Sequence, residues 1–294
     1  MLTPRRLFRL FKQAAMAWVE DYAPSMGAAI AYYTAFSLAP LLVIVIAIAG
    51  ALFGREAVQG LIVAEMSGLI GKEGASIVQT LVAHASDTER GLVAGGISAA
   101  LLLVGATTVF AELQSALDRI WHVPPSEKPS GVWSVLRARL LSFGLVLGVA
   151  FLLMVSLAVS TALAALGEWS SGLVPGWEKV LEALHVLVSL AVFTLLFAMI
   201  YKLLPSTPID WGNVWVGAFV TSLLFAVGKL LIGLYLGKSS VTESFAAAGS
   251  LVVLLAWVYY AAQVFLLGAE FTKVYAQEGK ESAEHRAREI APER

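Results

Sequence analysis

Residues 251–275 read LVVLLAWVYYAAQVFLLGAEFTKVY, and this stretch decides the class of the protein. Its first 19 residues, 251–269, carry no formal charge. At a rise of about 1.5 Å per residue, a helix of that length crosses the roughly 30 Å hydrocarbon core of a bilayer. The stretch therefore predicts a transmembrane helix over about 250–275.

Polar residues interrupt this apolar run on one side. Gln263 and Glu270 lie seven residues apart and so share a helix face, and Tyr260 lies on or near that face. Polar groups in spanning helices usually face the protein interior or a water-filled path. We interpret these three residues as candidate functional positions, with Glu270 as a proton-linked or substrate-contacting carboxylate. The alternative for Glu270 is contact with water, or an ion pair with an arginine near the cytoplasmic side: Arg119, Arg137 or Arg139.

The composition of the whole chain agrees with a membrane protein. The 294 residues are 59% hydrophobic and only 14% charged, whereas soluble domains are about 45–50% apolar and about 25% charged. A net charge of −1 gives no sign of nucleic-acid binding, which needs a basic surface. The absence of cysteine excludes disulfides, iron–sulfur clusters and thiolate zinc sites, and we expect no cofactor.

The N-terminal residues 1–23 have the pattern of an amphipathic helix. The apolar residues of one face recur at helical spacing: Leu7, Leu10, Phe11, Ala14 and Trp18. The basic residues occupy the opposite side: Arg5, Arg6, Arg9 and Lys12. This pattern is typical of a helix that lies in the interface of an anionic membrane. A plain basic flank that sets the membrane topology is the alternative.

Apolar segments elsewhere predict an all-α, polytopic fold with six transmembrane helices between residues 24 and 276. The expected spans are residues 26–53, 91–120, 140–166, 180–204, 211–236 and 250–275. Residues 54–90 are too polar to span and are expected to form short amphipathic surface helices outside the cytoplasm. Residues 277–294 are expected to form a charged, disordered cytoplasmic segment.

Basic residues set the predicted orientation of these spans. An even number of spans places both termini on one side of the membrane. On the side of the termini the segments hold fourteen lysines and arginines, against five on the other side. The positive-inside rule therefore places both termini in the cytoplasm.

Four further polar residues within the predicted spans are candidate functional positions. Tyr32 and Tyr33 lie in the first span, which Pro40 should kink, and they either line a cavity or pack against neighbouring helices. Glu112 lies in the second span and either contacts substrate or forms a structural ion pair. Lys229 lies in the fifth span and either attracts an anionic head group or extends its stem to the interface.

Long motifs spread along the chain resemble the YihY/BrkB family. The motifs are AYYTAFSLAPLL (31–42), GATTVFAELQSALDRIW (105–121), RARLLSFGLVLG (137–148), YKLLP (201–205) and residues 228–276, which begin GKLLIGLYLG. The resemblance covers about residues 14–276. It implies a six-helix protein of the bacterial inner membrane. The family has carried the labels ribonuclease BN-like and virulence factor BrkB, and transport of lipid-like solutes has been proposed for it.

The motifs expected of an enzyme are missing from the sequence. The four histidines are far apart, and the sequence contains no H-x-H, D-x-D, G-x-S-x-G or P-loop motif. We therefore expect a non-enzymatic protein and regard the ribonuclease label as the least supported function. Our leading hypothesis is a transporter or flippase-like protein for a lipid or other amphipathic solute, with membrane lipids as partners. A non-transporting scaffold for an envelope complex is the alternative.

Overall fold

The computed structural model describes residues 4–54, 108–124, 177–238 and 249–290, with scattered positions between 56 and 80 and at 126, 144, 148, 152 and 159. Within these residues every regular element is a helix, as the sequence predicts. The helices are α1 (Pro4–Glu20), α2 (Ala23–Phe53), α6 (Trp177–Leu203), α7 (Trp211–Lys238) and α9 (Gly249–Ile290). An additional helical segment covers residues 108–120.

Three of the described helices are long and apolar enough to cross a membrane. The candidate spans are Lys179–Leu203 in α6, Trp211–Lys229 in α7 and Leu254–Glu281 in α9. Helix α2 coincides with the predicted first span, 26–53. Of the predicted span 91–120 only the part from residue 108 is described, and the predicted segments 54–90 and 140–166 lie largely outside the described residues. Six spans and cytoplasmic termini therefore stay predictions.

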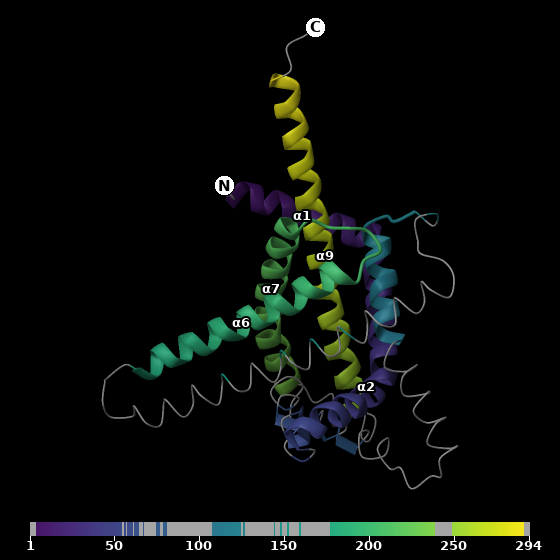
Figure 1. Cartoon of the computed structure of the whole chain (residues 1–294), viewed down its shortest axis with the longest axis vertical. Helices are drawn as coiled ribbons and strands as arrows, with labels where there is room; N and C mark the ends of the chain where they lie inside the picture. Colours follow the sequence, from purple (N-terminus) through teal and green to yellow (C-terminus); the bar gives the residue numbers. More distant parts are fainter. Residues whose placement is uncertain are drawn as a thin grey trace.

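Helix α9 is the element on which the other described helices converge. Figure 1 shows α9 in yellow along the long axis of the molecule, with α7 running beside it and α2 near its lower half. Helix α1 runs across α9, and α6 extends away from α7 and α9. Helix α2 changes direction in the lower part of the view, as expected for a helix that contains a proline.

Helices α7 and α9 approach closely because each places a glycine against a threonine of the other. A Cβ atom on Gly217 would overlap the side chain of Thr272, and a Cβ atom on Gly268 would overlap Thr221. Both threonine hydroxyls donate to the carbonyl four residues earlier in their own helix, at 2.7 Å. Small residues at these positions permit tight packing of spanning helices, which lack the hydrophobic driving force available in water.

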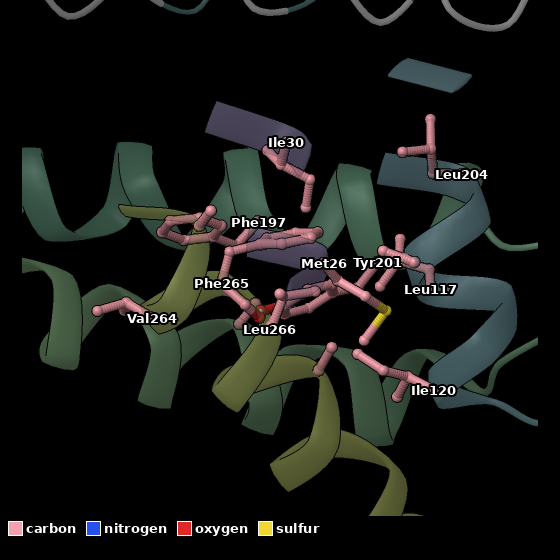
Figure 2. Close-up of a cluster of buried hydrophobic side chains, with 14 of the residues drawn as sticks. Met26, Ile30, Leu117, Ile120, Phe197, Tyr201, Leu204, Val264, Phe265 and Leu266 are labelled. Carbon is pink, nitrogen blue, oxygen red and sulfur yellow. The ribbon is translucent and has the colours of Figure 1, made fainter. Parts of the chain in front are cut away.

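The main buried cluster joins α2, the segment 108–120, α6, α7 and α9. Figure 2 shows the labelled side chains that meet there: Met26, Ile30, Leu117, Ile120, Phe197, Tyr201, Phe265 and Leu266. Tyr201 of α6 is the polar centre of this cluster. Its hydroxyl donates to the carbonyl of Phe265 on α9 at 2.7 Å and lies 3.0 Å from the hydroxyl of Thr221 on α7. One buried side chain thus ties three helices together.

Helix α1 lies within the predicted amphipathic segment, but its apolar face has a different neighbour from the one expected. Leu10 and Ala14 are completely buried with Phe271 of α9, and the rings of Phe11 and Phe271 lie 4.9 Å apart. This corrects the expectation that the apolar face rests in lipid. An apolar surface supplied by α9 buries those side chains as well as lipid would, and the pairing of Arg6 with Glu278 at 2.8 Å fixes the register.

Helix α9 continues past the predicted last span. The sequence predicts disorder from residue 277, whereas the helix continues to Ile290, so the expected disorder of residues 277–290 is wrong. Residues 277–290 read QEGKESAEHRAREI, which is rich in residues of high helix propensity and places Glu281 four residues before His285 and Glu284 four residues before Arg288. A helix already nucleated by the preceding span continues through such a sequence at little cost.

Candidate functional site

The predicted carboxylate Glu270 lies in a buried cluster of charged residues. Its side chain is fully buried (0% exposed), and neither carboxylate oxygen accepts a hydrogen bond within the described part of the chain. The ammonium nitrogen of Lys273, one turn further along α9, lies 3.5 Å from Oε2. The same nitrogen donates a hydrogen bond of 3.1 Å to Asp21, which lies between α1 and α2. Two carboxylates therefore share one lysine.

The second oxygen of Asp21 contacts His122, which follows the helical segment 108–120. Nε2 of His122 lies 3.0 Å from Oδ1 of Asp21, and the histidine ring is mostly exposed. His122 and Tyr22 both adopt a positive φ, of 49° and 58°. Left-handed backbone is uncommon for residues other than glycine and costs on the order of 1 kcal/mol or more. The Asp21–His122 contact thus joins the two turns that contain these left-handed residues.

The segment 108–120 is attached to the rest of the fold by a second buried carboxylate. Asp118 accepts the backbone N–H of Ser206 at 2.8 Å and its hydroxyl at 2.8 Å. Gln114 donates a longer bond of 3.4 Å to the same hydroxyl. Ser206 lies in the connection between α6 and α7. Asp118 therefore fixes the position of His122, four residues later, relative to the transmembrane helices.

Charge balance distinguishes the cluster of Asp21, Glu270, Lys273 and His122 from an ordinary ion pair. With His122 neutral, the two ionised carboxylates and one ammonium carry a net charge of −1 in a largely buried place. Partial burial alone would raise the pKa of Asp21, but its contacts with His122, Glu270 and Lys273 outweigh burial and lower that pKa below its ordinary value of 3.8. Asp21 is therefore ionised, and Glu270 is the carboxylate that holds the uncompensated charge or takes up a proton.

The other candidate residues of α9 form contacts with neighbouring helices. Gln263 donates a weak bond of 3.4 Å to the carbonyl of Pro24, its amide packs on Gly27, and its oxygen is buried without a partner among the described residues. The hydroxyl of Tyr260 donates to the carbonyl of Leu224 at 3.4 Å. Gln263 and Glu270 thus both face the N-terminal part of α2 or the link before it, which confirms their shared face.

The remaining predicted positions are not part of the charge cluster. Tyr32 and Tyr33 project from α2, where Tyr32 is exposed and their ring centroids lie 5.6 Å apart. Glu112 and Lys229 are partly exposed, and neither forms an ion pair with another residue that the structure describes. Of the three α9 candidates, Gln263 contacts α2, Glu270 belongs to the charge cluster, and Tyr260 contacts α7.

The expectation that Glu270 pairs with Arg119 is also corrected. Its ionic neighbour is Lys273 of the same helix, and Arg119 is not paired with it. Arg137 and Arg139 lie outside the described residues. Sequence reasoning missed Asp21 and His122 as members of the cluster. The sequence offers one indication of them: Asp21 and His122 are polar residues that come just after the end of a helix with a buried apolar face.

Metal-dependent hydrolysis finds no support in the described residues. They contain no group of three or more His, Cys, Asp or Glu side chains arranged to hold a metal ion. Asp21 and Glu270 are instead engaged by an ammonium group. The cluster has the chemistry of a site that balances charge by binding a proton or a cationic group.

Comparison with known proteins places this fold in a family. The family described as virulence factor BrkB matches residues 14–291, almost the whole chain. The chain belongs to the BrkB family. The match extends through the helical extension of α9, beyond the last residue at which the sequence motifs resemble the family.

Curated relatives in the BrkB family are membrane proteins. A UPF0761 membrane protein of Photobacterium profundum is 30% identical over 252 residues, which cover 82% of this chain and 73% of the relative. One from Ralstonia nicotianae is 27% identical over 85% of this chain and 55% of its own length. The UPF0761 membrane protein YihY of Salmonella typhimurium is 32% identical over 60% of this chain and 57% of its own length. The chain thus spans little more than half the length of several relatives that it matches. No solved structure matches it.

Proposed function

We propose that this BrkB-family membrane protein moves a lipid or another amphipathic solute across the bacterial inner membrane, and that the Glu270 cluster takes part in that movement. The observation that carries the proposal is the complete burial of Glu270 in the candidate span Leu254–Glu281 without a hydrogen-bond partner in the described residues. An unsatisfied buried carboxylate costs several kcal/mol. A helix that served only as an anchor has no need to bear that cost.

Two binding events would balance the cluster. A proton on Glu270 leaves Asp21 and Lys273 as a neutral pair at 3.1 Å. A cationic group placed against Glu270 has the same electrostatic effect. The link between α1 and α2 contains Asp21 and packs on α9. Binding and release of the proton or cationic group would therefore change both the charge of the cluster and the packing of α9 against this link. No ATP-binding motif is present in the sequence, so the movement would be passive, ion-coupled or driven by a partner.

A scaffold role is the second candidate, and the extension of α9 favours it. The helix is 42 residues long, whereas about 20 residues are enough to cross a bilayer. Its charged end at 277–290 would present a regular surface to a soluble partner. Under this alternative Glu270 and Lys273 only stabilise the fold, and loss of residues 277–294 rather than loss of the carboxylate would remove function.

Mass spectrometry of molecules that stay bound during gentle purification tests the transport proposal. We would compare the unchanged protein with Glu270→Gln and with the control Glu281→Gln, which removes an exposed carboxylate of α9 outside the cluster. We expect a defined amphipathic species, enriched over bulk lipid, in the unchanged protein and in the control, and its loss in Glu270→Gln. That species would then be tested for transfer between leaflets of proteoliposomes.

The opposite pattern would overturn the proposal. Identical bulk lipid in all three samples, from proteins that stay folded, would remove the substrate-binding interpretation of Glu270. Loss of a co-purifying protein after deletion of residues 277–294, with Glu270→Gln unaffected, would instead support the scaffold.

A further inference from the structure

We propose that the exposed face of α1 binds the head groups of anionic phospholipids at the surface of the bilayer. The inference is independent of the transport proposal, because it concerns the opposite side of α1 from the one that packs on α9. It also differs from the usual arrangement of an amphipathic helix, in which the apolar face rests in lipid. Here the apolar face is already buried against protein.

The position of α1 places it at the depth of lipid head groups. Its buried face forms a cluster with Phe271 of α9, and Val216 and Val220 of α7 pack against that cluster. At the start of the same span, five residues and one residue before Val216, Trp211 and Trp215 are exposed, with ring centroids 6.3 Å apart. Exposed tryptophans at a span end mark the membrane interface. Helix α1 runs across α9 rather than along it (Figure 1), so it lies along the membrane surface if α7 and α9 cross the membrane.

The outward face of α1 combines basic and apolar side chains. Phe8, Met16 and Val19 are exposed by 74%, 53% and 62%. Residues 5, 9 and 12 are basic and exposed. The residues of this outward face recur at helical spacing: Arg5, Phe8, Arg9, Lys12, Met16 and Val19. Apolar side chains at head-group depth reach the edge of the hydrocarbon, while arginine and lysine heads stay with the phosphates.

Charge complementarity favours an anionic lipid as the occupant of this face. Helix α1 contains four basic residues and one acidic residue, Glu20. Arg6 and Arg9 both engage Glu278 of α9. Arg5 and Lys12 are in no ion pair with any residue that the structure describes, and both point outward. Each such charge near an anionic leaflet contributes about 1 kcal/mol of attraction.

Environment-sensitive fluorescence of the full chain in nanodiscs tests the proposal. The chain has no cysteine, so an Ala15→Cys variant carries one label on the outward side of α1. A Gly279→Cys variant carries the control label, because a side chain added at that position on the α9 extension meets no other part of the described protein within 4 Å of its Cβ atom. Nanodiscs would contain phosphatidylcholine with increasing fractions of phosphatidylglycerol. We expect a blue shift of the label at position 15 that grows with phosphatidylglycerol and reverses in high salt.

Charge variants give the quantitative test. The phosphatidylglycerol fraction that gives half of the maximal blue shift should rise about fivefold in Lys12→Gln. It should rise about fivefold again when Arg5→Gln is added to that variant. Lys280→Gln, which removes an exposed lysine of the α9 extension, should leave it unchanged. An equal emission in phosphatidylcholine and phosphatidylglycerol overturns the proposal. So does a fully aqueous emission in both lipids, which would leave this face for a soluble partner. A shift that is equal at positions 15 and 279 would show a nonspecific response and also overturn it.

Discussion

Replacement of Lys273 by methionine should be the most damaging single change in the charge cluster. Methionine keeps the length of the side chain but removes the only fixed positive charge. The cluster then holds Asp21 and Glu270 without an ammonium group, and its net charge goes from −1 to −2. Glu270→Gln changes the net charge in the other direction, to zero, and should be tolerated.

The distances give the size of the effect. The ammonium nitrogen lies 3.1 Å from Asp21 and 3.5 Å from Glu270. At an effective dielectric constant of about 20, each contact contributes about 5 kcal/mol of attraction. Removal of the lysine also removes the cost of burying it, which is several kcal/mol. We therefore expect Lys273→Met to lower the free energy of unfolding by about 3–5 kcal/mol, and Glu270→Gln to change it by less than about 1 kcal/mol.

Thermal unfolding of the detergent-solubilised variants measures this difference. A loss of about 3–5 kcal/mol corresponds to a fall in Tm of roughly 6–20 °C for a domain of this size. Lys280→Met on the same helix is the control, because that lysine is exposed. Its replacement should move Tm by no more than about 2 °C.

The double variant Lys273→Met/Glu270→Gln tests the charge argument itself. It restores the net charge to −1 and should recover a large part of the lost stability. Two results would refute the reasoning. One is a Lys273→Met protein as stable as the control, and the other is a double variant no more stable than Lys273→Met alone.

Further predictions concern packing, the second carboxylate and pH. Gly268→Ala should destabilise the protein by about 1–3 kcal/mol, because the added methyl group overlaps α7. Gly279→Ala should stabilise it by up to about 1 kcal/mol, because alanine has the higher helix propensity. Thermal unfolding of the two variants measures both effects. Asp118→Ala removes both bonds to Ser206 and should cost about 2–3 kcal/mol, checked by unfolding and by faster proteolysis at residues 108–124. Because the pKa of Asp21 is lowered in the folded protein, the ionised carboxylate stabilises the fold. That contribution to the free energy of unfolding is complete above pH 3.8 and is lost as pH falls through the lowered pKa. The Tm difference between the unchanged protein and Asp21→Asn should therefore be constant at neutral pH and shrink only below that pH. A difference that already shrinks between pH 7 and 5 would contradict this assignment.

The sequence predicts the helices well because apolar length and helical periodicity are local properties. The predicted spans at 26–53, 180–204 and 211–236 agree with α2, α6 and α7 to within three residues at each end. The error at the end of α9 has a local cause too. A charged composition suggests disorder, but it is also compatible with a helix whose first turns are already formed.

The partners within the site could not be predicted in the same way. Glu270 was identified because a carboxylate in an apolar helix is conspicuous in any sequence. Asp21 and His122 were not, because 101 residues separate them and neither interrupts a pattern. Their contact depends on how α1 packs on α9, and the apolar face of α1 fits a protein surface and a lipid surface equally well. Periodicity defines that face without identifying what it packs against.

The glycine–threonine packing between α7 and α9 restricts how this bundle can change shape. Each threonine sits in the notch left by a glycine of the facing helix, at two levels one turn apart. Sliding or turning one helix on the other would drive a side chain into backbone at both levels. Helices α7 and α9 therefore move as one rigid unit, and Tyr201 attaches the end of α6 to that unit. Under the proposed transport function, alternating access would require α7 and α9 to tilt together against α2, with the turn at Asp21 and Tyr22 as the hinge.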